Sequence, residues 1–363
     1  MIEAVFKRKA YLPLFFWQGR PGAKVLMDFC QQLATLLSAG MPVLPSLVIL
    51  AQQAQNHRLR LAIRSAINSV EQGRSLAEAL AREPRIFPAF FTSIVEAGET
   101  GGVLDQALQR LAFHYERKND LEQKIKTATA YPKFVLLIIM AVVIFLLTFV
   151  IPAFAATFAV MGVELPLPTS MVIALGEGMR TYWYLPAGGA AVGFLFLRQI
   201  MQTNWGAYSA DYLQLYLPLI GRLYRKLLVA RFCGTLSAML SSGIGLLTAL
   251  ELAKNVVQNR VFSRRIDRVK ESIMRGETVA QTLAAAGLFP RLVIGMVHVG
   301  EQSGKMDEML ARAAGLYETE VSYLADRLGT LLEPALVIFL SFMVGGIVLS
   351  VFLPIFSVFS LYH

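Results

Sequence analysis

Charged side chains and cysteines are both scarce in this chain of 363 residues. Only 16% of the residues are charged, whereas 55% are hydrophobic and the mean hydropathy is +0.53. This composition exceeds what the core of a soluble protein requires, so it implies a membrane protein. The two cysteines, Cys30 and Cys233, have no histidine pair nearby and are too few for a zinc site. We interpret them as small buried hydrophobic residues.

Signatures of catalysis are also missing. The four histidines form no ligand pair at helical spacing, and no nucleophile–histidine–acid set is present. The segment from Gly300 to Lys305 superficially resembles a phosphate-binding loop. A Walker loop, however, needs glycine where Val299 stands and serine or threonine where Met306 stands. The sequence therefore gives no reason to expect an enzyme, a cofactor or a bound metal.

The chain does contain an internal repeat of one sequence unit. Residues 29–40 return as residues 232–243 at an offset of 203, with Gly40 matched by Gly243. Residues 98–105 return as residues 300–307 at an offset of 202. A near-constant offset over this length indicates a duplicated structural unit.

Each copy continues through a proline into a long uncharged stretch. Pro132 leads into residues 134–163, and Pro334, which follows Glu333, leads into the end of the chain. Both stretches exceed the roughly 20 apolar residues that span a bilayer, and a weaker third candidate lies between them. The predicted organisation is an N-terminal basic and aromatic arm (1–24), a first cytoplasmic bundle (25–133), a first span (134–158), an external loop and surface helix (159–180), a second span (181–201), a second cytoplasmic bundle (202–333), a third span (334–358) and a short external tail (359–363).

The distribution of cations predicts the topology. Residues 134–197 contain a single cation, Arg180, and none follows residue 333. With three spans, the positive-inside rule places both bundles in the cytoplasm and the C-terminus outside. Each bundle is only mildly basic, which suits a surface of anionic lipid better than nucleic acid. The N-terminal segment is too short and too interrupted for a cleavable signal.

Helical signals dominate both copies, and no period-two alternation predicts a sheet. Apolar residues from 26 to 37 trace one helix face that ends at Gly40. Ser75 to Glu78 form a capping box, and Thr278 to Gln281 repeat it with different residues. The fold class predicted is therefore all-α, with two homologous bundles of about six helices each and three transmembrane helices.

The glycine–glutamate turns are the candidate site. We expect positive φ at Gly98 and Gly300, and we place Glu99 and Glu301 near the start of the following helix. A structural role leads, contact with a partner protein comes next, and a cation held by Glu96, Glu99 and Asp105 is a further alternative. The full set of structural or partner-contact candidates is Gly40, Gly98, Glu99, Gly102, Asp105, Pro132, Gly243, Gly300, Glu301, Gly304, Asp307, Glu333 and Pro334.

A small membrane transporter is the competing class of protein. Such a protein normally carries an acid or base at membrane depth, and none of the predicted spans carries an internal one, because Arg198 lies near the end of the second span, where its side chain can snorkel. The nearest candidate is Glu177, which we place on the outer surface helix. The sequence therefore favours an assembly role over transport.

Together these features resemble the type II secretion F-domain family, the multi-pass platform proteins of type IV pilus and type II secretion machines. The resemblance covers residues 25–358 and rests on both glycine–glutamate turns, on the proline entries to the spans, on Leu165 to Thr169, and on Leu217 to Gly221 followed by Arg231 and Phe232. It implies an inner-membrane protein without a catalytic centre.

The resemblance also implies the partners. Family members form oligomers and act between a cytoplasmic hexameric ATPase and pilin or pseudopilin subunits, beside other inner-membrane assembly proteins. The implied function is mechanical coupling of ATPase movement to the extraction and polymerisation of pilins. Because few residues precede the first bundle here, we favour a type IV pilus system slightly over a type II secretion system.

Overall fold

The computed structural model describes residues 22–160, 184–217 and 220–361, together with isolated residues between 170 and 182. All regular elements among them are helices, so the all-α prediction is confirmed. The chain divides into two compact units. The first unit comprises Met1–Gln123 and Met201–Leu324, and the second comprises Lys124–Ile200 and Ala325–His363.

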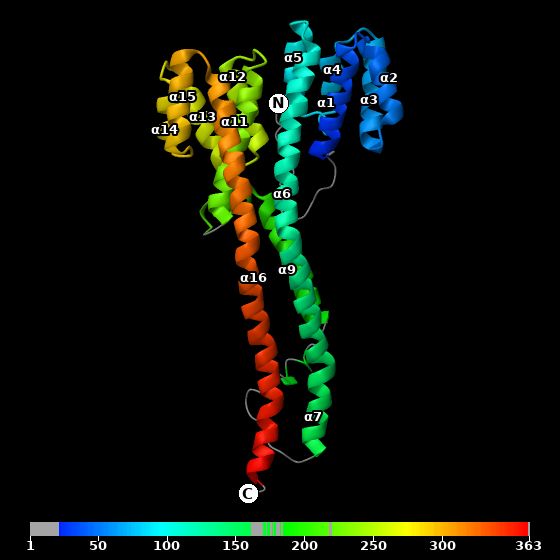
Figure 1. Ribbon diagram of the computed structural model, residues 1–363, viewed down its shortest axis with the longest axis vertical. Helices are drawn as coiled ribbons and strands as arrows, with labels where there is room; N and C mark the ends of the chain where they lie inside the picture. Colours follow the sequence, from blue (N-terminus) through cyan, green and yellow to red (C-terminus); the bar gives the residue numbers. More distant parts are fainter. Residues whose placement is uncertain are drawn as a thin grey trace. The chain divides into compact units, whose positions relative to one another are not determined.

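The first bundle is built from six helices (Figure 1). A stripe of Leu26, Phe29, Cys30 and Leu33 on the first helix is buried, as the helical period predicts. The helices are α1 (Ala23–Ser38), α2 (Val43–Gln53), α3 (His57–Glu71), α4 (Leu76–Ala81), α5 (Ala89–Thr100) and the first part of α6 (Leu104–Phe145).

The second bundle repeats this order of helices and adds one helix in front of it. The repeated helices are α11 (Ile220–Leu240), α12 (Leu246–Val257), α13 (Arg260–Met274), α14 (Val279–Ala286), α15 (Arg291–Ser303) and the first part of α16 (Met306–Leu361). The added helix is α10 (Asn204–Tyr216), which packs against α11 and α13. Figure 1 shows the helices of the first bundle in blue to cyan and those of the second in yellow-green to orange.

Helix α10 is fixed to the start of α13 by Asp211. The Asp211 carboxylate accepts a hydrogen bond from the backbone N–H of Arg260 at 2.9 Å, while the buried Asn259 caps α13 by accepting from the N–H of Phe262 at 2.9 Å. Burial raises the pKa of Asp211, and the hydrogen bond from Arg260 acts in the opposite direction. The second bundle therefore has an attachment with no counterpart in the described residues of the first bundle.

Phenylalanine clusters fill both cores. In the first bundle the ring centroids of Phe29 and Phe87 lie 5.5 Å apart, with Phe91 of α5 as the third ring. In the second bundle Phe232 and Phe289 take the equivalent positions at 5.2 Å, and the third ring comes from α13. The duplicated unit has kept two rings and exchanged the third, which conserves apolar volume rather than sequence.

Two helices contain a stretch long and apolar enough to cross a membrane. One runs through α6 into the π-helix η2 (Leu146–Val150) and α7 (Ile151–Val160), and the other is α16. Most of their apolar side chains face outward, as in Phe342, which is 80% exposed. A helix in the core of a soluble protein would bury such side chains, so lipid is the environment they fit.

The third predicted span is not found among the described residues. Helix α9 (Tyr184–Gln202) covers most of the predicted 181–201 segment, but in the part of the chain that the structure describes it is not among the helices long and apolar enough to cross a membrane. The described chain therefore has two candidate spans rather than three. The positions of the domain boundaries on either side of them stay predictions.

Candidate functional site: the glutamate clamps

The side chain of Glu99 caps a helix that precedes it in the chain. Its carboxylate oxygens accept hydrogen bonds from the backbone N–H groups of Leu76 at 2.8 Å and Ala77 at 3.0 Å. The hydroxyl of Ser75 accepts from the N–H of Glu78 at 3.1 Å. Three of the four N–H groups that begin α4 are thus satisfied, and the carboxylate lies where the helix dipole favours a negative charge.

Glu301 makes the same arrangement in the second bundle. Its carboxylate accepts from the N–H groups of Val279 at 2.7 Å and Ala280 at 3.2 Å, while Thr278 accepts from Gln281 at 3.3 Å. We call each glutamate, with the two backbone N–H groups that it binds, a glutamate clamp. Each clamp joins the end of α5 or α15 to the start of α4 or α14.

This geometry corrects one prediction about the glutamates. Glu99 and Glu301 lie near the ends of α5 and α15, and not near the start of the helix that follows. The reason is that the helix continues past Gly98 and Gly300 before it turns. The anion is stabilised by a helix N-terminus as expected, but the helix is the short one behind it in sequence.

The prediction of positive φ at Gly98 and Gly300 is wrong. Both lie inside helices, and a Cβ atom at Gly98 would come within 2.4 Å of the Cβ of Ala107. A Cβ at Gly300 would come within 2.8 Å of the Cα of Met306. Close approach of the next helix, rather than backbone conformation, therefore requires glycine at these positions.

The left-handed residues of the turns lie four positions further on. Gly102 has φ of 68° and Gly304 has φ of 71°, and the N–H of Val103 donates to the carbonyl of Gly98 at 2.8 Å. This pattern is that of a helix ended by a glycine at C′. Gly40 and Gly243, with φ of 83° and 80°, follow α1 and α11 in the same conformation.

A cation site at the first turn finds no support in the described part of the chain. Both oxygens of Glu99 are already occupied by backbone N–H groups. No group of three histidine, cysteine, aspartate or glutamate side chains that could hold a metal occurs among the described residues. Asp105 and Asp307 instead begin α6 and α16, where an acidic side chain stabilises a helix N-terminus.

The cysteines are buried and free. Cys30 and Cys233 are both inaccessible to solvent, and burial raises the pKa of each thiol, for Cys233 to about 12. A thiol in such surroundings is neither a nucleophile nor a metal ligand. Their interpretation as small hydrophobic residues fits the structure.

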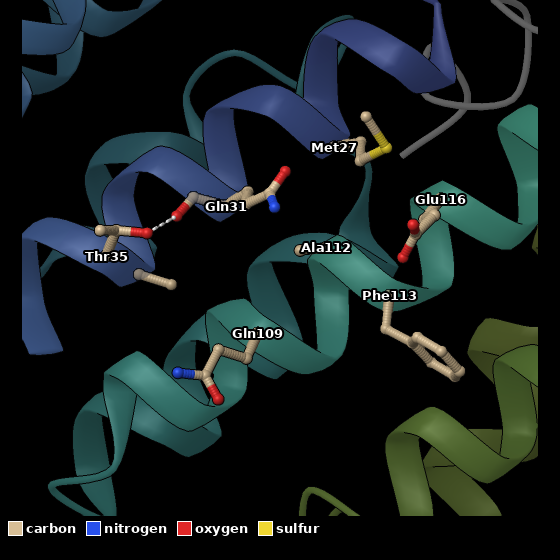
Figure 2. A pocket seen from close by; sticks show the side chains of 8 residues that line it. Met27, Gln31, Thr35, Gln109, Ala112, Phe113 and Glu116 are labelled. Atoms are coloured by element: carbon tan, nitrogen blue, oxygen red, sulfur yellow. Dashed lines mark hydrogen bonds between the residues drawn. The ribbon is translucent and has the colours of Figure 1, made fainter.

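A groove of about 220 Å³ opens between α1 and α6 of the first bundle (Figure 2). Figure 2 shows Gln31 and Thr35 on one wall and Gln109, Phe113 and Glu116 on the other. The second bundle is closed at the equivalent place. There a Cβ on Gly234 of α11 would lie 3.5 Å from the Cβ of Ala314 of α16, so the two helices touch. The groove is thus a difference between otherwise similar bundles.

The remaining candidates lie outside the turns. Pro132 stands inside α6, and Glu333 and Pro334 stand inside α16, so neither proline ends its helix. Glu177 and residues 165–169 are outside the described residues. Sequence reasoning missed the backbone partners of Glu99 and Glu301. The signal was present, since a capping box precedes each glutamate by about the same distance in both copies.

Comparison with known proteins agrees with this duplicated architecture. The family model for type II secretion system protein F matches residues 29–152 and again residues 232–354. The chain therefore belongs to the type II secretion system protein F family.

Curated relatives extend over nearly the whole chain. It is 37% identical to the type IV pilus assembly protein TapC of Aeromonas hydrophila, over 93% of this chain and 83% of the relative. It is 39% identical to the type IV pilus assembly protein PilC of Thermus thermophilus, with the same two coverages. It is 32% identical to the type II secretion system protein F of Pseudomonas aeruginosa, over 92% of this chain and 83% of the relative.

Proposed function

We propose that this chain is the non-enzymatic inner-membrane platform protein of a type IV pilus assembly system. It couples a cytoplasmic hexameric ATPase to the extraction of pilin subunits from the bilayer and to their polymerisation. The observation that carries the proposal is the pair of matching bundles, each continued by one unbroken helix into an apolar stretch. Relatives named for type IV pilus assembly support the choice of machine.

The mechanical part of the proposal follows from these continuous helices. Helices α6 and α16 leave their bundles without a loop, and backbone hydrogen bonds along a helix resist bending better than a loop does. Each glutamate clamp ties two further helices of the bundle together beside the start of that long helix. Force applied to a bundle by an ATPase would therefore be passed on with little loss to local bending.

A platform protein of a type II secretion system is the second candidate, because relatives at 32% identity carry that name. Deletion of the gene in its host separates the two candidates. Loss of surface filaments with normal export of secreted proteins is expected for the pilus protein, and complementation with the full chain should restore filaments. Loss of export with intact filaments would overturn the pilus assignment in favour of secretion.

The non-enzymatic part has its own test. The full chain, purified in lipid nanodiscs, should bind the assembly ATPase of the same host and hydrolyse no ATP alone. Intrinsic hydrolysis that survives repurification would contradict it.

A further inference from the structure

The two bundles contact each other within the first compact unit, and the contact is one-sided. Helix α5 of the first bundle packs against α12 of the second. Arg110 of α6 donates to the backbone carbonyl of Ser241, just after the end of α11, and lies 3.5 Å from the hydroxyl of Ser242. The guanidinium thus binds a carbonyl left unpaired at a helix C-terminus, where a cation is favoured.

A two-fold relation between the bundles would produce each of these contacts twice. The copy of the α5–α12 contact would join α15 to α2, and the copy of the Arg110 contact would join Arg312 to Ser38. Among the residues that the structure describes, α15 does not pack on α2 to a comparable extent, and no hydrogen bond joins Arg312 to Ser38. The contact is therefore heterologous: it joins unlike faces of two like bundles.

Because the two bundles are alike but use different faces in this contact, each bundle still has, uncovered, the face that the other one uses. The first bundle retains the equivalent of the covered face, at the end of α1 and along α2. The second bundle retains the equivalent of the covering face, along α15 and at Arg312. We propose that a second copy of this chain fills this position, with α15 and Arg312 of one copy docked on α2 and the end of α1 of the other.

Exposure of the equivalent residues supports the proposal. Ser241 and Ser242 are partly covered by the first bundle, whereas Ser38 and Ala39, which stand at the same repeat positions, are exposed. Arg312, the equivalent of Arg110, is exposed as well. An arginine donor and a helix end with free carbonyls are therefore both available on the surface.

Both free faces also carry apolar side chains in solvent. On α15, Leu292 and Val299 are 54% and 53% exposed, and their spacing of seven places them on the same side of the helix. On α2, Val48 is 38% exposed. At the position equivalent to Val48 the second bundle has Glu251, which pairs with Lys254 and Lys270.

Two residues on the α6 wall of the groove in Figure 2 have counterparts at the contact between the bundles. Phe113 and Glu116 on its α6 wall correspond to Gly315 and Glu318 of α16. There the guanidinium of Arg117 reaches Glu318 at 3.5 Å, and a Cβ on Gly315 would lie 3.6 Å from it. In the second bundle this strip is therefore covered by the first bundle.

Heterologous contacts between copies continue until they close a ring or extend as an open array. The proposal goes beyond the proposed function and does not depend on it, because it concerns only contacts between copies. A platform built in this way would place first and second bundles in alternation.

Cross-linking between differently tagged copies tests the proposal in native membranes. One copy carries Ser38→Cys, the other carries Arg312→Cys, and the reagent is a bis-maleimide about as long as an arginine side chain. The native cysteines stay, since both are fully buried. We expect a mixed-tag dimer at least several-fold more abundant than with the exposed Asn68→Cys of α3 in place of Ser38→Cys.

A single chain with Arg110→Cys and Ser242→Cys is the internal control, and it should form an intrachain link. No excess of mixed dimer over the Asn68→Cys control would overturn the proposal. Failure of the intrachain pair would overturn it too, because the template contact would then be absent. As a second measurement, Leu292→Asp should lower the oligomer mass of the full chain in nanodiscs, whereas Leu61→Asp on α3 should leave it unchanged.

Discussion

The carboxylate of Glu301 lies 2.7 Å from the backbone nitrogen of Val279, although the two residues are 22 positions apart. The first bundle holds Glu99 and Leu76 in the same relation at 2.8 Å. In each case a charged hydrogen-bond acceptor serves a helix of fewer than ten residues, which could not hold its shape alone. The clamp thereby makes a short connecting segment part of a rigid bundle.

Loss of the clamp charge should loosen α14. Glu301→Gln keeps one acceptor oxygen but removes the charge, so we expect the local free energy of opening to fall by about 1–2 kcal/mol. Amide hydrogen exchange at Val279 and Ala280 in the full chain should then accelerate by about 5–30-fold. The control is Glu308→Gln, at an exposed residue of α16 that pairs with Lys305 at 3.6 Å. Equal rates of amide hydrogen exchange at Val279 and Ala280 in both variants would show that the charge of Glu301 does not stabilise α14.

A methyl group at Gly98 should be tolerated only if the facing methyl group is removed. Gly98→Ala brings its Cβ against the Cβ of Ala107, and overpacking of this kind costs about 1–3 kcal/mol. Ala107→Gly in the same chain should recover much of that loss in chemical denaturation. Additive effects of the two substitutions would mean that they do not meet. At Gly300 the obstacle is backbone, so Gly300→Ala should lack a comparable rescue.

At Gly304, by contrast, backbone conformation should determine how much a substitution lowers the free energy of unfolding. Its φ of 71° lies in the left-handed region, and a Cβ there would meet no atom within 4 Å. Gly304→Asn should therefore cost little, whereas Gly304→Val should lower the free energy of unfolding by about 1–2 kcal/mol or more. Similar melting temperatures for the two variants would contradict this explanation.

Acid sensitivity of the first bundle should depend on His114. Burial, with the Phe90 ring at a centroid distance of 4.7 Å, together with the nearby charges of Lys118 and Arg117, lowers the pKa of His114 to about 3. Between this value and the unfolded pKa of about 6.5, the unfolded chain binds more protons. Stability from this group is therefore complete above pH 6.5 and falls as the pH drops towards 3.

The variant that checks this is His114→Leu, which introduces the residue found at the equivalent position of the second bundle, Leu316. Urea midpoints measured from pH 7.5 to 4.5 should fall less steeply for this variant than for the parent chain. The same substitution at the exposed His57 should leave the slope unchanged. A parallel fall in His114→Leu would assign the acid sensitivity to other groups.

Repetition in the sequence predicts most of the fold. Helix faces, capping boxes and the glycines at 40 and 243 are local features, so periodicity and turn chemistry suffice to find them. The order of helices then follows twice from one pattern. The middle span was less accessible to this reasoning, because prolines, glycines and a flanking arginine weaken the apolar signal of residues 181–201.

The site was predicted in composition but not in geometry. Gly98 and Glu99 stand out in the sequence, yet a glycine required for close packing and a glycine required for positive φ look identical in sequence. The structure distinguishes the two cases, because it places Ala107 against Gly98 with no room for a Cβ atom. The partners of Glu99 are backbone N–H groups more than 20 residues away, which carry no residue identity that a sequence could display.

The most direct test of the platform assignment measures where pilin resides. In a host lacking this gene, pilin should accumulate in the inner membrane and be absent from the sheared surface fraction. The full chain supplied in trans should return it to surface filaments. Normal amounts of surface pilin in the deletion strain would contradict the account.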